Sequence, residues 1–195
     1  MLTETRTPEV LRADVAHGAE EAIICVEGLT KHFGPVVAVD GLSFTVPRGS
    51  VCALLGGNGA GKTTTLSILL GLLLPTAGTI RILGVDMLRE RYRVLPRMNF
   101  TSPYVDLPHR LTVEQNLAVY GRLYGVPRLA ERIERLGEEL ELAEFLRRPY
   151  GSLSAGQRTR VSLAKSLLNE PVVLLMDEPT ASLDPDSADR MRGYL

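Results

Sequence analysis

The stretch VCALLGGNGAGKTTT, residues 51–65, decides the fold of this chain. Its first five residues form a continuous apolar run, which predicts a strand buried on both faces, as in a parallel sheet. The segment GGNGAGKT, residues 56–63, fits the phosphate-binding pattern G-x-x-x-x-G-K-[ST], and residues 62–74 have the composition of a helix. A strand, a glycine loop and a helix in this order predict a P-loop nucleotide-binding fold.

The residue types of this loop suit a phosphate ligand. Its glycines let the backbone turn with positive φ, so that bare N–H groups face phosphate oxygens, and the following helix adds the positive end of its dipole. Lys62 would reach the β- and γ-phosphates of ATP as a point charge, and the hydroxyl of Thr63 would ligate Mg²⁺. The loop residues expected to bind the nucleotide are Gly56, Gly57, Asn58, Gly59, Ala60, Gly61, Lys62, Thr63 and Thr64.

Two carboxylates end a second apolar run, VVLLMDE, residues 172–178. Parallel strands present their carboxyl ends to the crevice that binds ligands, so Asp177 is expected beside the phosphate loop as a Mg²⁺ ligand. Glu178 is then placed to orient or deprotonate an attacking water, which makes Glu178 and Lys62 the predicted catalytic residues. In the absence of a phosphate loop, simple solvent exposure would explain such an acid pair better.

Between these two motifs the hydrophobic period becomes helical, and two stripes of apolar side chains predict packed amphipathic helices. Thr112 with Gln115 predicts a capping box at the start of one helix. Ser154 with Gln157, in the segment SLSAGQ, predicts another, and Gly156 leaves room for a phosphate to approach the backbone there.

The front of the chain has the pattern of antiparallel β-structure. Residues 23–27 and 42–46 predict two strands of a hairpin-like section, with turn formers at Gly34-Pro35 and Asp40-Gly41 between them. The predicted fold class is α/β: a P-loop NTPase core with a mostly parallel sheet, an N-terminal antiparallel β section and an inserted helical lobe.

Composition and charge exclude several classes of function. The 195 residues are 45% hydrophobic and 23% charged, with a formal net charge of −1. This balance gives no global attraction to nucleic acid or to an anionic membrane, so no nucleic-acid partner is expected. Cys25 and Cys52 lie in β-type apolar runs, which predicts buried, reduced thiols. The first twenty residues lack an apolar segment of signal-peptide length, and residues 66–75 are too few to span a bilayer, which takes about 20 residues.

Together these motifs resemble the nucleotide-binding domain of the ATP-binding cassette (ABC) ATPases. GGNGAGKTT corresponds to the family's Walker A loop, LSAGQ (residues 153–157) to its signature, VVLLMDEPT to its Walker B strand, and ASLD (residues 181–184) to its D-loop. Weaker similarities are LTKHFG near the start, GLLLPTAGTI after the first helix and LTVEQNL in the helical lobe. The resemblance runs from about residue 23 to the C-terminus.

The resemblance implies that two subunits share two ATP molecules with Mg²⁺. It places Phe33 against adenine, and it places Ser154, Gly156 and Gln157 against the γ-phosphate of ATP bound to a second ABC ATPase subunit. Closing and opening of this homo- or heterodimer would drive transmembrane permease subunits. The chain would then be cytoplasmic, peripheral at the inner face of the cell membrane, and in contact with the membrane only through these partners.

The sequence departs from the family pattern at several positions. Gly57 stands where proline is usual, which loosens the unbound loop by about 0.5–1 kcal/mol, and Ala155 replaces the first of two signature glycines. In residues 97–108, where the family's Q-loop glutamine is expected, the sequence has TSP, with Ser102 as the polar candidate to replace it.

Family members follow the D-loop with a further strand and a histidine that contacts the γ-phosphate. None of the three histidines of this sequence follows Asp184. We therefore expect a shortened cassette: a flexible tail over residues 1–20 and an ABC-type ATP-binding domain over residues 21–195, with the helical lobe at about residues 98–165 and without the last core strand and the H-loop.

The leading functional hypothesis is an ATP-hydrolysing subunit of an ABC transporter. A second hypothesis, motivated by the missing glutamine and histidine, is a nucleotide-binding module with little or no turnover. A third is a soluble ABC-type ATPase of DNA repair or translation. The sequence disfavours the third, because a compact helical lobe rather than a long coiled coil separates Lys62 from Leu153, and because it carries one cassette rather than two.

Overall fold

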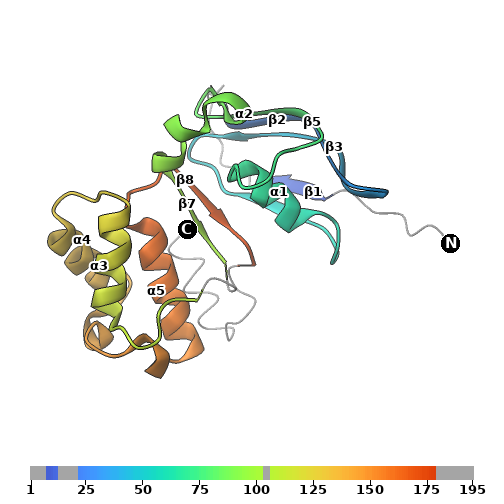
Figure 1. The fold of residues 1–195 in the computed structure, drawn as a ribbon. Helices are drawn as coiled ribbons and strands as arrows, with labels where there is room; N and C mark the ends of the chain where they lie inside the picture. Colours follow the sequence, from blue (N-terminus) through green and yellow to red (C-terminus); the bar gives the residue numbers. More distant parts are fainter. Residues whose placement is uncertain (1–7, 13–21, 103–105, 179–195) are drawn as a thin grey trace. The chain divides into compact units, whose positions relative to one another are not determined.

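The computed structural model describes residues 8–12, 22–102 and 106–178, with its elements labelled in Figure 1. The chain divides into two compact units, Met1–Leu95 and Pro96–Leu195, and each unit has its own arrangement of strands and helices. The first unit carries the phosphate loop, and the second carries the acid pair and the segment LSAGQ.

A four-stranded antiparallel sheet, in the order β3-β2-β5-β6, is the basis of the first unit. Its strands are β2 (Ala22–Phe33), β3 (Val36–Pro47), β5 (Ala77–Ile82) and β6 (Val85–Asp86). Apolar side chains on one face of β2 and β5 are buried and form its core: Ile24, Val26, Leu29, Ile80 and Ile82. The predicted N-terminal antiparallel section is therefore confirmed.

The β2–β3 hairpin is longer than the sequence pattern predicts. Both strands have 12 residues, and the turn between them includes Gly34, whose φ is 57°. The other predicted turn, at Asp40-Gly41, lies within β3, close to register shifts of the ladder on either side of Lys31. Extra residues in one strand are absorbed in such irregularities, so a dipeptide typical of turns is accommodated inside a strand.

The strand before the phosphate loop, β4 (Cys52–Leu55), pairs antiparallel with β1 (Glu9–Arg12). The sequence predicts a flexible tail over residues 1–20; these four residues instead form a strand, because β4 offers them backbone hydrogen-bonding partners. The sequence also predicts that β4 is buried on both faces. Its side chains instead alternate between partly buried and exposed, since its described neighbour is one short antiparallel strand.

Helix α1 (Lys62–Leu69) follows the phosphate loop and ends before the predicted residue 74. Gly71 has a φ of 68°, and its N–H donates to the carbonyl of Ile68 at 2.9 Å. A glycine in the left-handed region just past the last turn is a common helix terminator. After β5 and β6, α2 (Met87–Glu90) and η1 (Arg91–Arg93) complete the described part of this unit.

The second unit contains a parallel pair, β7 (Met98–Thr101) and β8 (Val173–Met176), with Met98 opposite Val173. Among the described residues, this two-stranded sheet is the parallel one. Because β7 occupies residues predicted to open the helical lobe, the helices begin later than residue 98.

Three helices carry the core of the second unit. They are α3 (Val113–Leu123), α4 (Leu129–Glu139) and α5 (Ala155–Leu167). The short elements η3 (Ala143–Phe145) and η4 (Tyr150–Ser152) lie between α4 and α5, whereas η2 (Leu95–Arg97) comes directly before β7. Helix α3 contacts both α4 and α5 (Figure 1). The predicted apolar stripes face inward, and the buried cluster includes Leu117, Leu136, Leu142, Val161 and Leu168.

Both predicted capping boxes are present. The hydroxyl of Thr112 accepts a hydrogen bond from the N–H of Gln115 at 3.1 Å, and the Gln115 side chain accepts one from the N–H of Thr112 at 2.9 Å. Ser154 and Gln157 form the same reciprocal pair at 3.2 and 3.0 Å. None of the helices in the described ranges is both long enough and apolar enough to cross a membrane.

Candidate functional site

The phosphate loop is open at its tip and fixed at its far end. Residues 55–59 are exposed, whereas Ala60 is buried. The N–H of Ala60 donates to the carbonyl of Gly57 at 3.1 Å, and the N–H of Thr65 donates to the carbonyl of Gly61 at 2.8 Å. A loop held in this way can present the N–H groups of its exposed part to an anion at the start of α1.

The last glycine of the loop is required by both conformation and space. Gly61 is the N-cap of α1, with a φ of 89°. A Cβ atom at this position would lie 2.2 Å from the carbonyl oxygen of Ala38 on β3. Gly57 differs, because a Cβ atom there would meet nothing within 4 Å and its φ is not positive. The loop therefore packs against β3 at Gly61, while Gly57 faces open space.

The ammonium group of Lys62 lies against the loop itself. Its Nζ atom donates to the carbonyl of Gly56 at 2.7 Å and to that of Gly57 at 3.0 Å. Thr63 is exposed in the first turn of α1. A cation and a hydroxyl at the head of a helix, next to exposed backbone amides, form a set of groups that suits a polyphosphate.

Phe33 lies at the end of the β2–β3 hairpin in the same unit, with 49% of its surface exposed. It pairs with Val36, and two residues further along β3 is Ala38, the residue that Gly61 approaches. The hairpin thus connects the aromatic ring expected to contact adenine with the strand that supports the phosphate loop.

The acid pair follows β8 directly. Asp177 is 5% exposed, and its N–H donates to the carbonyl of Thr101 on β7 at 3.0 Å, which continues the parallel ladder. Glu178 is exposed, with a φ of 46°. This left-handed conformation costs a non-glycine residue about 1–2 kcal/mol.

The segment that replaces the Q-loop glutamine is tied to α5. The hydroxyls of Thr101 and Ser162 are 2.9 Å apart. Ser102, the polar candidate of the sequence analysis, is 6% exposed. Its side chain is therefore buried within the unit.

The start of α5 presents the residues of the segment LSAGQ. Ser154 and Ala155 are exposed, and Gly156 and Gln157 are half-buried. The capping box uses the Ser154 hydroxyl as an acceptor and the Gln157 Oε1 atom as an acceptor. A hydroxyl that accepts one hydrogen bond can still donate its own proton, and a glutamine amine can still donate, so both side chains keep donors for an anion.

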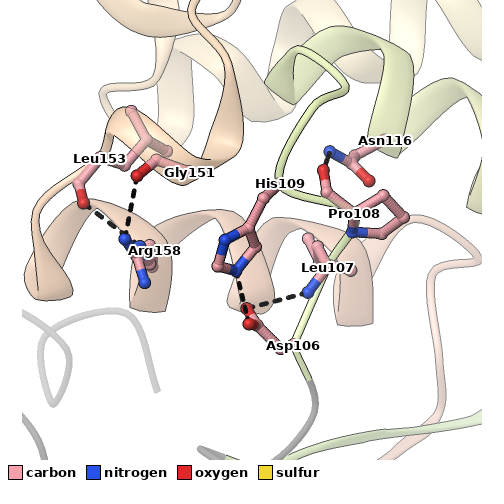
Figure 2. Close-up of polar contacts among 8 residues, drawn as sticks. All are labelled: Asp106, Leu107, Pro108, His109, Asn116, Gly151, Leu153 and Arg158. Carbon is pink, nitrogen blue, oxygen red and sulfur yellow. Dashed lines mark hydrogen bonds and ion pairs between the residues drawn. The ribbon is translucent and has the colours of Figure 1, made fainter.

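The loop before Ser154 is bound both to the segment around His109 and to Arg158, and Figure 2 shows the bonds from Arg158 to Gly151 and Leu153. The N–H of Gly151 donates to the carbonyl of His109 at 3.0 Å. Arg158, one turn into α5, donates to the carbonyls of Leu153 and Gly151 at 3.2 and 3.1 Å. These bonds fix the position at which α5 begins.

Side chains reinforce the same connection. The Oδ2 atom of Asp106 lies 2.5 Å from the Nε2 atom of His109. The centroids of the His109 and Tyr150 rings are 5.7 Å apart. Burial and the nearby charge of Asp106 raise the pKa of Tyr150 to about 12. Burial alone would raise the pKa of Asp106, but hydrogen bonding to His109 and the charge of that histidine lower it. The acid therefore stays ionised over the ordinary pH range.

The predicted site residues fall into two groups, one in each unit. The first unit holds Phe33, Gly56, Gly57, Asn58, Gly59, Ala60, Gly61, Lys62, Thr63 and Thr64; the second holds Ser154, Gly156, Gln157, Asp177 and Glu178. Within the described ranges, no cluster of three or more His, Cys, Asp or Glu side chains could hold a metal by itself. Mg²⁺ is commonly held by one or two protein oxygens together with substrate phosphates, so it does not need such a cluster.

A family model described as ABC transporter matches residues 39–181, which include the phosphate loop, LSAGQ and the acid pair. The chain belongs to the ABC transporter family. The match covers well over half of the chain and confirms the resemblance deduced from the motifs.

Curated relatives are named as ATP-binding proteins, one of Nod factor export and one of daunorubicin resistance. The chain is 42% identical over 179 residues to Nod factor export ATP-binding protein I of Ralstonia nicotianae, covering 89% of this chain and 56% of that protein. It is 42% identical over 167 residues to daunorubicin resistance ATP-binding protein DrrA3 of Streptomyces coeruleorubidus, covering 85% of this chain and 53% of that protein. The chain thus spans about half the length of these curated relatives.

Solved structures of the family confirm the fold. MJ1267, an ATP-binding cassette of an ABC transporter, matches with a TM-score of 0.79 at 26% identity, over 89% of this chain and 76% of that one. CbiO1 of Clostridium perfringens, described as part of the ABC transporter complex cbiONQ, matches with a TM-score of 0.79 at 27% identity, over 90% and 72%. The predicted α/β P-loop fold class is therefore confirmed.

Sequence reasoning missed two features of the site. One is the connection between Asp106, His109 and Tyr150, because residues this far apart in sequence give no periodic signal. The other is the contact of Lys31 with Phe33, at 5.0 Å between Nζ and the ring centroid. The second had a usable signal, since residues two apart on a strand lie on one face.

Proposed function

We propose that this chain is the ATP-binding and ATP-hydrolysing part of an ABC transporter. The observation that carries the proposal is the geometry of the phosphate loop. Its residues 56–59 are exposed, the Lys62 ammonium lies against it, and Gly61 caps the helix that follows. Residues 21–195 would form the ATP-binding domain.

In the proposed reaction, Lys62 and the loop amides bind the β- and γ-phosphates and offset the negative charge that develops during in-line attack by water. Thr63 and Asp177 would hold Mg²⁺, which supplies charge neutralisation at the phosphates when bound. Glu178 would orient the attacking water and accept its proton. Its exposure and its position next to the buried Asp177 support this role.

Ser154, Gly156 and Gln157 are proposed to bind the γ-phosphate of ATP held by a second ABC ATPase subunit. The exposed start of α5, with donors that the capping box leaves available, supports this role. Phe33 is proposed as the platform for adenine. Transmembrane permease subunits are the proposed partners, at the inner face of the cell membrane. The family match and a relative named for Nod factor export support a role in transport.

A second candidate is a nucleotide-binding module with little or no turnover. The observation that favours it is Ser102, which is buried where the family's glutamine would contact metal and water. The two candidates make the same prediction for nucleotide binding and opposite predictions for phosphate release.

Phosphate release from Mg-ATP by the purified chain separates them. We expect turnover in the wild type, a loss of at least about 100-fold in Glu178→Gln because general-base catalysis is removed, and unchanged ATP affinity in that variant. Lys62→Ala should abolish binding. Binding with no release by the wild type would select the non-hydrolysing module, and equal ATP binding by wild type and Lys62→Ala would refute both candidates.

A further inference from the structure

Lys31 and Phe33 form a contact that the proposed function does not include. They are two apart on β2 and therefore on the same face of the strand. The Lys31 Nζ atom lies over the Phe33 ring, 5.0 Å from its centroid. This is within the range of about 6 Å over which a cation is attracted to the face of an aromatic ring.

The ammonium group is held in place from its other side. Lys31 Nζ donates to the carbonyl of Leu74 at 2.8 Å. The segment that carries this carbonyl is itself bound to β2, since the N–H of Thr76 donates to the carbonyl of Thr30 at 2.8 Å and the Thr76 hydroxyl accepts from the N–H of His32 at 3.0 Å. The ammonium group thus lies between the Leu74 carbonyl, whose segment is hydrogen-bonded to β2, and an exposed ring.

Lys31 has no carboxylate partner within the described ranges: the ion pairs found there do not include it. Its contacts are the Leu74 carbonyl and the Phe33 ring. A lysine at the surface usually satisfies its charge with water or an acid, so a fixed position over a half-exposed ring indicates a role directed at that ring.

We propose that Lys31 is a positioning residue for adenine, which holds the Phe33 ring by one face so that the opposite face receives the base. This inference rests on the proposed function, in which Phe33 stacks on adenine. Holding the ring before the base arrives lowers the entropy cost of ordering it on binding. The cation also attracts π-electron density toward its own side, which weakens the repulsion between the ring and the electron-rich face of adenine.

A purely structural role for Lys31 makes a different prediction. The Leu74 carbonyl follows α1, the helix that begins at the phosphate loop. If Lys31 only stabilised this connection, its loss would weaken binding of any polyphosphate. If Lys31 instead positions the ring for the base, its loss weakens binding only of ligands that contain adenine.

The test compares Mg-ATP with inorganic tripolyphosphate, a probe without a base, by titration calorimetry on the wild type, Lys31→Met and Lys31→Gln. Lys31→Gln removes the charge while it keeps a donor for the Leu74 carbonyl. For both variants we expect the Kd of ATP to rise about two- to fivefold, the value for an exposed cation–π contact, and the Kd of tripolyphosphate to stay unchanged. Lys31→Arg should restore ATP binding, because guanidinium also stacks on rings.

Two controls isolate the contact. Arg89→Met removes one positive charge from an exposed residue of the same unit and should leave both Kd values unchanged. Phe33→Ala should raise the Kd of ATP about tenfold. When Lys31→Met is added to Phe33→Ala, the Kd of ATP should rise by less than about 1.5-fold further, because the ring on which Lys31 acts is gone. Circular dichroism of each variant confirms that it is folded.

The outcomes are distinct. An unchanged ATP Kd in Lys31→Met, or an equal rise for ATP and tripolyphosphate, overturns the positioning role and leaves the proposed function standing. Failure of the wild type to bind ATP, or binding of both probes by Lys62→Ala as by the wild type, overturns the proposed function and this inference with it.

Discussion

At the scale of single residues, two glycines of the phosphate loop match the same sequence pattern but differ in backbone conformation and packing. Gly61 adopts a left-handed conformation and touches the Ala38 carbonyl, whereas Gly57 does neither. The sequence identified both as loop residues, since the pattern is local. It did not reveal that only Gly61 is constrained by β3, because that contact depends on tertiary packing.

The first prediction follows from this difference. Gly61→Ala should lower the free energy of unfolding by about 2–4 kcal/mol, from left-handed strain and from the displaced Ala38 carbonyl. Gly57→Ala, a matched change in the same loop, should alter it by less than about 1 kcal/mol. Urea unfolding followed by circular dichroism measures both, and equal values for the two variants would show that the contact with Ala38 has no energetic weight.

At the scale of elements, the sequence predicts where helices begin better than it predicts which strands pair. The capping boxes before α3 and α5 were predicted from four residues each and are both present. The pairing of β1 with β4 was missed, because backbone hydrogen bonding between distant strands leaves little trace in composition. The hairpin was predicted, but its length was not, since irregular ladders tolerate residues that usually mark turns.

The second prediction uses the two capping boxes as a matched pair. Thr112→Ala and Ser154→Ala should each cost about 1 kcal/mol of stability, because each leaves an N–H at a helix start without its partner. Only the Ser154 variant should lower ATP turnover, since only that hydroxyl is proposed to contact phosphate.

Ser154→Asp provides a sharper control for the same helix start. Aspartate is as good an N-cap as serine, so the stability should be kept. Its negative charge would oppose the γ-phosphate, so turnover should fall at least as far as in Ser154→Ala. Full turnover in Ser154→Asp would argue against the proposed phosphate contact.

At the scale of the whole molecule, each unit has a core of its own, one between strands and one between helices. The sequence predicted this α/β organisation from the change of hydrophobic period, and the family model and the solved structures confirm it. The fold class and the phosphate loop could be predicted because their signals are contiguous. The contact between the rings of His109 and Tyr150 could not, since it joins segments about 40 residues apart.

Another prediction concerns stability at alkaline pH. The pKa of Tyr150 is raised to about 12, whereas a tyrosine in an unfolded chain ionises near pH 10. Above pH 10 the unfolded state therefore loses this proton first, so stability falls as the pH rises toward 12, by at most about 2–3 kcal/mol. Urea midpoints between pH 8 and 12 should show this decline, and it should be shallower in Tyr150→Phe. Identical slopes would mean that Tyr150 ionises equally in both states.

The hydrogen bonds of the Lys62 ammonium to the Gly56 and Gly57 carbonyls have a consequence for the strength of nucleotide binding. An arriving triphosphate would have to replace these two neutral acceptors with its own charged oxygens. The net gain from Lys62 is therefore the difference between charge-assisted and neutral hydrogen bonds, not the full strength of the new contacts.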